Sequence, residues 1–104
     1  MDLSIAPTTT GSVTRLAVTG EVDVSNASIL RDALDKALGK DMRLEVDMSD
    51  VPYIDSTGIG VLVGTAHRAT ELGGSLAVMH PQANVSRVLG LLGVADDLNV
   101  IEGD

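Results

Sequence analysis

The chain has 104 residues, and its apolar fraction of 44% is enough for one hydrophobic core without disulfides or metal ions. It contains no cysteine, which excludes a disulfide framework, a cysteine-ligated zinc site and a thiol nucleophile. Its net charge of −8 repels phosphate backbones and anionic lipid headgroups. We therefore expect a single domain over residues 1–104, with neither a nucleic acid nor a membrane as its partner.

The sequence carries no targeting or membrane segment that we can identify. No apolar run approaches the roughly 20 residues that a membrane-spanning helix needs. The first 20 residues lack the basic start and the apolar stretch of a signal peptide. We therefore expect a cytoplasmic protein.

Two short strands are predicted at the start of the chain, because residues 3–5 and 14–18 alternate between apolar and polar side chains. The intervening polar stretch, residues 7–11, is typical of a turn. A helix should follow, with Ser25 or Asn26 as its N-cap and Gly39 at its end. Its apolar positions recur at helical spacing and are Ile29, Leu30, Ala33, Leu34, Ala37 and Leu38.

Strands and helices then alternate to the end of the chain. Strands are predicted at residues 43–48, 75–79 and 99–101, and a helix is predicted from about residue 57 to Gly73. A third helix should begin after Pro81 and end at Gly93. Its apolar positions are Val85, Val88, Leu89 and Leu92. This order predicts an α/β domain with a mixed, mostly parallel sheet, an N-terminal hairpin and helices packed on the sheet.

Three glycines, Gly58, Gly60 and Gly64, lie in the first half of the predicted second helix. Each glycine costs about 1 kcal/mol relative to alanine inside a helix, so helix propensity does not explain them. Tight packing of the helix on the sheet is one explanation. Close approach of a partner's surface is the other, and the sequence leaves both open.

Ser56 and Thr57 are expected at the N-cap or in the first turn of this helix. Unpaired amides and the positive end of the helix dipole favour an anion at that point. From spacing alone, Ser56 fits both an ordinary capping serine and a serine that is phosphorylated.

The outer face of the same helix is a candidate contact surface. Helical spacing separates it from a core-facing stripe that consists of Ile59, Leu62, Val63 and Ala66. The outer stripe consists of Thr57, Val61, Gly64 and Arg68. Val61 is therefore predicted to be an exposed apolar residue.

Three short segments together resemble the STAS domain of bacterial anti-sigma factor antagonists. They are Gly-Glu-Val-Asp at 20–23, Val-Asp-Met-Ser at 46–49 and Asp-Ser-Thr-Gly-Ile-Gly-Val-Leu at 55–62. The resemblance extends to Pro81, residues 85–89 and Gly93, and so covers nearly the whole chain. In this family the serine directly after the aspartate is the phosphoacceptor, which corresponds to Ser56.

The resemblance implies a partner-switching cycle. The unphosphorylated antagonist binds an anti-sigma factor, which is also an ATP-dependent serine kinase, and thereby releases a sigma factor. Phosphorylation ends the complex, and a metal-dependent PP2C-type phosphatase restores it. The chain would be a ligand and a substrate, not an enzyme, and needs no cofactor or metal of its own. The residues expected to bind the partner are Glu21, Asp23, Asp55, Thr57, Gly58, Gly60 and Val61.

Many members of the family continue past the last strand into a C-terminal helix, whereas this sequence ends at Asp104. This difference leaves open a self-association surface and hence a homodimer.

Two kinds of catalytic site are disfavoured by the motifs. Ser56 lacks the Gly-x-Ser-x-Gly context of a serine hydrolase, and His67 and His80 have no assignable role in a triad. A phosphate-binding loop would need Gly-Lys-[Ser/Thr] after the glycines, and this is absent.

Two other interpretations involve no hydrolysis. Asp47, Asp50 and Asp55 near strand ends suggest a phospho-aspartate receiver, but Lys36 and Lys40 are the only lysines and both come too early. The main alternative is a STAS module that serves as a scaffold in a stress-sensing complex or as an accessory of an ABC-type lipid transporter.

Overall fold

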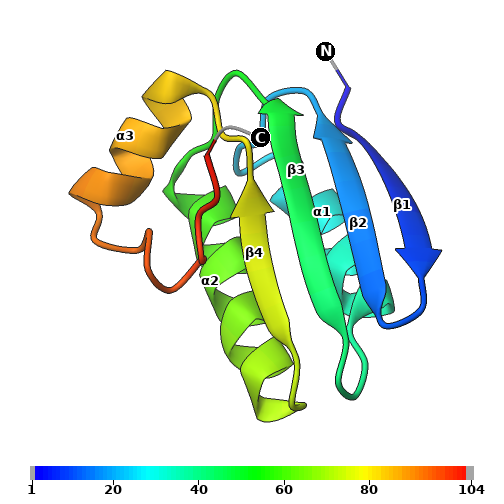
Figure 1. The fold of residues 1–104 in the computed structure, drawn as a ribbon. Coiled ribbons are helices and arrows are strands. Elements are labelled where there is room, and N and C mark those ends of the chain that lie inside the picture. The colour runs from blue at the N-terminus through cyan, green and yellow to red at the C-terminus, as the bar shows by residue number, and fades with distance from the viewer. Residues whose placement is uncertain (1, 103–104) are drawn as a thin grey trace.

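The computed structural model describes residues 2–102, which form a four-stranded sheet with helices α1 and α2 on one of its faces (Figure 1). The strands lie in the order β1-β2-β3-β4, with β1 antiparallel to β2 and the other pairs parallel. This arrangement confirms the predicted α/β class with an N-terminal hairpin. The elements are β1 (Ser4–Thr10), β2 (Val13–Thr19), α1 (Ala27–Ala37), β3 (Arg43–Asp50), α2 (Ser56–Glu71), β4 (Ser75–Met79) and α3 (Ala83–Leu91).

The hairpin is longer than predicted, because β1 continues through Pro7 to Thr10. Pro7 pairs with Leu16 in the ladder, and the turn itself contains Gly11 in a left-handed conformation, with φ of 61°. Proline has no N–H to donate, but β1 is an edge strand and needs donors on one side only. The three threonines that follow Pro7 are β-branched and favour a strand. The predicted turn over residues 7–11 was therefore wrong for residues 7–10 and is confirmed only at Gly11.

The core lies between the sheet and the two helices that cover it. Leu16, Val46 and Val78 are paired neighbours across β2, β3 and β4, and all are buried. They face the helices because side chains alternate along each strand. From the helices, Leu34 of α1 and Leu62 of α2 are fully buried against this row. Burial of one such leucine contributes about 1.5 to 3 kcal/mol, so this aliphatic layer supplies the main stabilisation.

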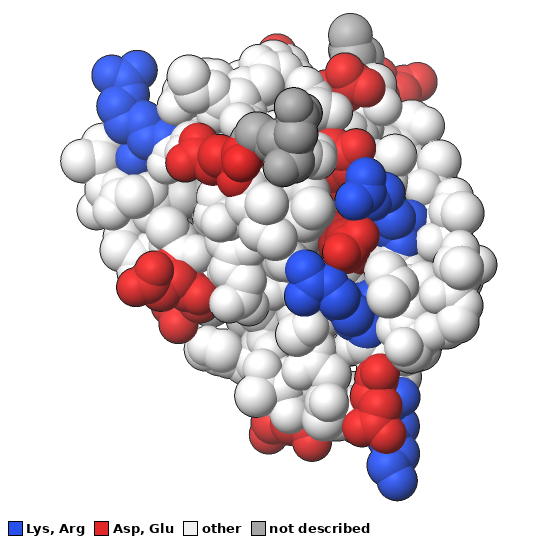
Figure 2. All heavy atoms as spheres, in the orientation of Figure 1, with Lys and Arg blue, Asp and Glu red and all other residues white. Residues whose placement is uncertain are grey.

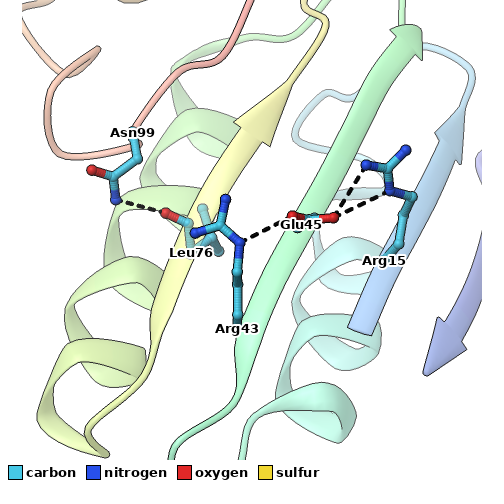
Figure 3. A network of polar contacts seen from close by, with 5 residues as sticks. All are labelled: Arg15, Arg43, Glu45, Leu76 and Asn99. Atoms are coloured by element: carbon cyan, nitrogen blue, oxygen red, sulfur yellow. Dashed lines mark hydrogen bonds and ion pairs between the residues drawn. The ribbon is translucent and has the colours of Figure 1, made fainter. Parts of the chain in front are cut away.

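The opposite face of the sheet is open and carries interleaved acidic and basic side chains (Figure 2). Glu45 on β3 lies between Arg15 on β2 and Arg43, with ion-pair distances of 3.1 Å and 3.0 Å (Figure 3). The hydrogen bond from Arg43, together with that from Arg15, holds the pKa of the Glu45 carboxyl below its ordinary value. The Arg15–Glu45 pair joins β2 to β3, whereas the Arg43–Glu45 pair lies within β3. The uncovered face therefore carries ion pairs where the covered face is packed with apolar side chains.

The C-terminal segment does not form the strand predicted at residues 99–101. It makes a single bridge, between Ile101 and Met79, and Asn99 has a positive φ of 46° that breaks the extended conformation. The segment still runs beside β4, because Val78 donates its N–H to Leu98 O and accepts one from Ile101. The Asn99 side chain donates to Leu76 O (Figure 3). Gly103 and Asp104 lie outside the described residues.

Two helices bury fewer of their apolar positions than their spacing predicted. Ile29 in α1 is 48% exposed, and Val88 and Leu92 at α3 are 38% and 54% exposed. α3 buries only Val85 and Leu89, because it lies beside the β4 end of the sheet and not over its face (Figure 1). Within residues 2–102, no helix is long and apolar enough to cross a lipid bilayer.

Candidate functional site

The connections that leave β2 and β3 lie side by side at the carboxyl edge of the sheet. Val22 and Ile54 form a parallel bridge, in which Val22 N donates to Tyr53 O at 2.9 Å and Asp55 N donates to Val22 O at 3.1 Å. Both bridge residues are buried. The bridge brings residues 21–23 next to residues 53–55, although about thirty residues separate them in the chain.

The loop before α1 is held in shape by Asn26. Its Oδ1 accepts a hydrogen bond from Asp23 N, and its Nδ2 donates to Glu21 O, both at 2.9 Å. Asn26 occupies the N-cap position, as predicted, but its side chain makes no capping hydrogen bond to the helix. Its amide instead fixes the loop that carries Glu21 and Asp23.

Asp23 is held in its charged form by neighbours in this loop. Its Oδ1 accepts hydrogen bonds from the hydroxyl and the backbone N–H of Ser25. The Ser25 hydroxyl contributes most, and these bonds lower the pKa of the Asp23 carboxyl. The loop therefore carries a negative charge at neutral pH.

Ser56 is the first residue of α2, and Asp55 is the N-cap. The carboxylate Oδ1 of Asp55 accepts the Gly58 N–H at 3.1 Å. The interpretation of Ser56 as a capping serine is therefore wrong, since a stronger acceptor directly before it already caps the helix. Ser56 is exposed, and within residues 2–102 its hydroxyl makes no hydrogen bond. The hydroxyl is thus free for modification without loss of the cap.

The glycines of α2 have different surroundings. A Cβ at Gly58 would lie 2.7 Å from Val22 Cγ1 and 2.8 Å from Ile54 Cγ1, so this glycine lets the helix start pack on the bridge. A Cβ at Gly60 would meet nothing within 4 Å. A Cβ at Gly64 would meet only the Arg68 guanidinium, at 3.5 Å. Tight packing against the domain therefore explains Gly58 and does not explain Gly60.

Val61 is buried, with only 6% of its surface exposed, so the prediction that it is exposed was wrong. Its stripe of α2 faces α1, as the ion pair between Arg68 and Asp35 of α1 shows. Thr65, on the same stripe, is fully buried and donates its hydroxyl to Val61 O. Two helices on one sheet face must cover each other's flanks as well as the sheet. Within α2, Thr57 and Gly60 are exposed positions near Ser56.

A third connection, between β4 and α3, is tied to the same edge of the sheet. Gln82 Nε2 donates to Ser49 O at 3.0 Å, and Asn84 Nδ2 donates to Pro52 O at 2.8 Å. These two contacts could not be predicted from the sequence, because they join residues more than thirty positions apart. They fix the loop that leads from β3 into α2.

The connections at this edge are acidic. Residues 20–26, 49–60 and 80–84 contain no lysine or arginine. They contain four carboxylates, which we call the acidic rim: Glu21, Asp23, Asp50 and Asp55. Over the described residues, no three His, Asp or Glu side chains are grouped so as to hold a metal ion. The edge is thus a negatively charged surface around an exposed serine.

The site thus consists of an exposed serine at the start of α2, on the carboxyl edge of a mostly parallel sheet that α1 and α2 cover on one face. The family described as "Mlab, STAS domain" matches residues 5–102. The chain belongs to this family.

Relatives of the chain include curated antagonists and solved structures. It is 34% identical to the anti-sigma-B factor antagonist of Bacillus subtilis (strain 168), over 80% of this chain and 76% of that protein. It is 30% identical to the protein of the same name in Staphylococcus aureus (strain NCTC 8325 / PS 47), over 99% of this chain and 96% of that one. The fold matches the anti-sigma factor antagonist SpoIIAA in its unphosphorylated form with a TM-score of 0.80 at 14% identity, covering 97% of this chain and 89% of that one. The phosphorylated form of SpoIIAA, from Bacillus, matches with a TM-score of 0.73 at 14% identity, covering 99% of this chain and 92% of that one.

Proposed function

We propose that this chain, as a single domain over residues 1–104, is an anti-sigma factor antagonist that phosphorylation of Ser56 switches off. In its unphosphorylated form it binds an anti-sigma factor that is also a serine kinase, and so releases a sigma factor. A PP2C-type phosphatase restores the binding form. The chain acts in the cytoplasm as ligand and substrate, and it catalyses no step itself.

The observation that carries this proposal is the separation of two roles at adjacent residues. Asp55 caps α2, while Ser56 is exposed and its hydroxyl has no partner in the described part of the chain. A kinase can therefore modify Ser56 without unfolding the helix start. The names of the two curated relatives and the two forms of SpoIIAA support the same function.

The acidic rim helps to explain why phosphorylation of Ser56 weakens binding of the partner. A phosphate on Ser56 adds about −1.5 to −2 charges next to Asp55 and close to the loop of Asp23. Two unit charges 4 Å apart interact by about 4 kcal/mol at an effective dielectric of 20. A partner that docks on this edge meets added bulk and charge, and about 1.4 kcal/mol is enough to weaken binding tenfold.

The amides at the start of α2 stabilise the phosphate on the domain itself. The positive end of the helix dipole stabilises an anion at this point, by about 0.3 to 1 kcal/mol at an exposed site. Phosphorylation should therefore release the partner and leave the domain folded.

The test is phosphorylation of the purified chain by candidate anti-sigma kinases with ATP, followed by mass spectrometry. We expect one phosphate, on Ser56. Ser56→Asp should bind the kinase at least tenfold more weakly than wild type, whereas Ser56→Ala should bind normally and accept no phosphate. Modification at Thr57 or Ser49 would contradict the assignment. Co-purification with transporter subunits, and with no anti-sigma factor, would favour the accessory role instead.

A further inference from the structure

The single aromatic residue of the chain, Tyr53, lies on the surface. It is 49% exposed, and the core is built from aliphatic side chains and methionine alone. Aromatic side chains bury more area than any other and are normally placed in cores or in interfaces. The sequence places this one three residues before Ser56, where it adds nothing to the aliphatic layer.

The direction of the Tyr53 side chain follows from its neighbours. Ile54 is the bridge residue and is 3% exposed, so its side chain points into the domain. In an extended segment the residues on either side point the other way, which directs Tyr53 and Asp55 outward. Tyr53 therefore shares the outer surface with the N-cap aspartate that precedes Ser56.

Val24 is a second exposed apolar residue at this edge, and 76% of its surface is accessible. The bridge between Val22 and Ile54 is parallel, so Val24 and Ser56 both lie two residues beyond it in the same chain direction. Two residues span at most about 7 Å, which keeps each of them close to the bridge. The Asn26 amide holds the Val24 loop in place, so this exposure belongs to a fixed loop.

We propose that Val24 and Tyr53 are the apolar anchors through which the anti-sigma partner docks around Ser56. This inference rests on the function proposed above and adds the residues that supply affinity. The occupant is a protein surface with an apolar pocket bordered by lysine or arginine. The acidic rim sets that chemistry, because the three connections hold four carboxylates and no lysine or arginine. Tyrosine is one of the residue types enriched in interface hot spots, and such anchors rarely exceed a few residues.

The anchors also explain why a single phosphate is enough to weaken binding of the partner. Apolar contacts give affinity only where water is excluded, and a doubly charged group at Ser56 keeps water at the centre of this surface. Modification of Ser56 would therefore weaken the contacts of Val24 and Tyr53 without touching either residue.

The experiment measures binding of the full chain to a panel of purified anti-sigma factors from the source genome by isothermal titration calorimetry. We expect Tyr53→Ala to weaken binding at least tenfold, Val24→Ser about threefold or more, and Tyr53→Phe less than threefold. Leu91→Ser is the matched control, since Leu91 is an 80% exposed residue at the far end of α3. It should bind within twofold of wild type.

Each outcome separates the two proposals. If the wild-type chain binds and Tyr53→Ala binds equally well, the anchors are refuted and the proposed function stands. An effect of Leu91→Ser as large as that of Tyr53→Ala also refutes the anchors. If the wild-type chain binds no anti-sigma factor, the proposed function fails and the inference fails with it. Thermal unfolding of each variant should match wild type, because both anchors are exposed.

Discussion

Replacement of Gly58 and of Gly60 by alanine should change stability in opposite directions. A Cβ at position 58 would lie 2.7 Å from Val22 Cγ1 and 2.8 Å from Ile54 Cγ1. Carbon atoms in normal contact are about 3.5 to 4.0 Å apart, so the overlap approaches 1 Å. Val22 is fully buried and β-branched, and it has few rotamers into which it can move. Overpacking of this kind costs about 1 to 3 kcal/mol.

The gain in helix propensity, about 1 kcal/mol at most, offsets part of that cost at Gly58. At Gly60 the same gain is unopposed, because nothing lies within 4 Å of the added Cβ. We therefore expect Gly58→Ala to lower the free energy of unfolding by about 1 to 2 kcal/mol and Gly60→Ala to raise it by up to about 1 kcal/mol. In a domain of this size, 1 kcal/mol corresponds to about 4 °C in Tm.

Urea denaturation followed by circular dichroism measures both variants against wild type. Gly58→Ala as stable as wild type, or Gly60→Ala less stable, would refute the packing argument. Binding of the anti-sigma factor adds a second readout for Gly60. If the partner's surface approaches the helix backbone there, Gly60→Ala binds more weakly although it is more stable.

Three further predictions use the same denaturation assay. The lowered pKa of Glu45 means that the native state binds fewer protons than the unfolded chain. The contribution of Glu45 to stability is therefore complete above its ordinary pKa of 4.5, and it is lost as the pH falls through the lowered pKa. Glu45→Gln should flatten the loss of stability as the pH falls below the ordinary value of 4.5, and an unchanged pH profile would contradict the role of Arg43. Asp55→Ala should cost about 1 kcal/mol through loss of the cap to Gly58 N, whereas Asp55→Asn, which keeps an acceptor, should cost less than half of that. Leu62→Ala should cost about 2 to 5 kcal/mol because the side chain is fully buried, and a cost below 1 kcal/mol would mean that the core collapses around the cavity.

Strands β2, β3 and β4 could be predicted because each carries its own local signal. Leu44, Val46 and Met48 alternate with polar residues along β3, and this period of two fixes both the strand and its buried face. The glycine pair at Gly73 and Gly74 ends α2 as expected, with Gly73 in a left-handed conformation at φ of 83°. Signals of this kind depend on a few neighbouring residues, so they can be recognised without knowledge of the tertiary structure.

Other details could not be predicted because they depend on contacts between distant elements. Val61 was assigned to an outer stripe because the helical spacing was interpreted as a single apolar face. α2 instead buries two faces, one against the sheet and one against α1. Gln82 and Asn84 join the start of α3 to the end of β3 and to the loop after it, through hydrogen bonds that depend on the fold and not on spacing. The sequence also placed Ser56 at the N-cap or in the first turn, and only the geometry of Asp55 decided between these positions.

The sheet ends on each side in a way that limits contact with further copies of the chain. Pro7 interrupts the row of amide donors on the outer edge of β1, and the segment from Leu98 to Ile101 occupies the outer edge of β4. A strand from a neighbouring molecule therefore finds no continuous ladder to join on either side. These closed edges limit fibril growth by strand addition, and they require only a single proline and eight residues of irregular chain, residues 94–101.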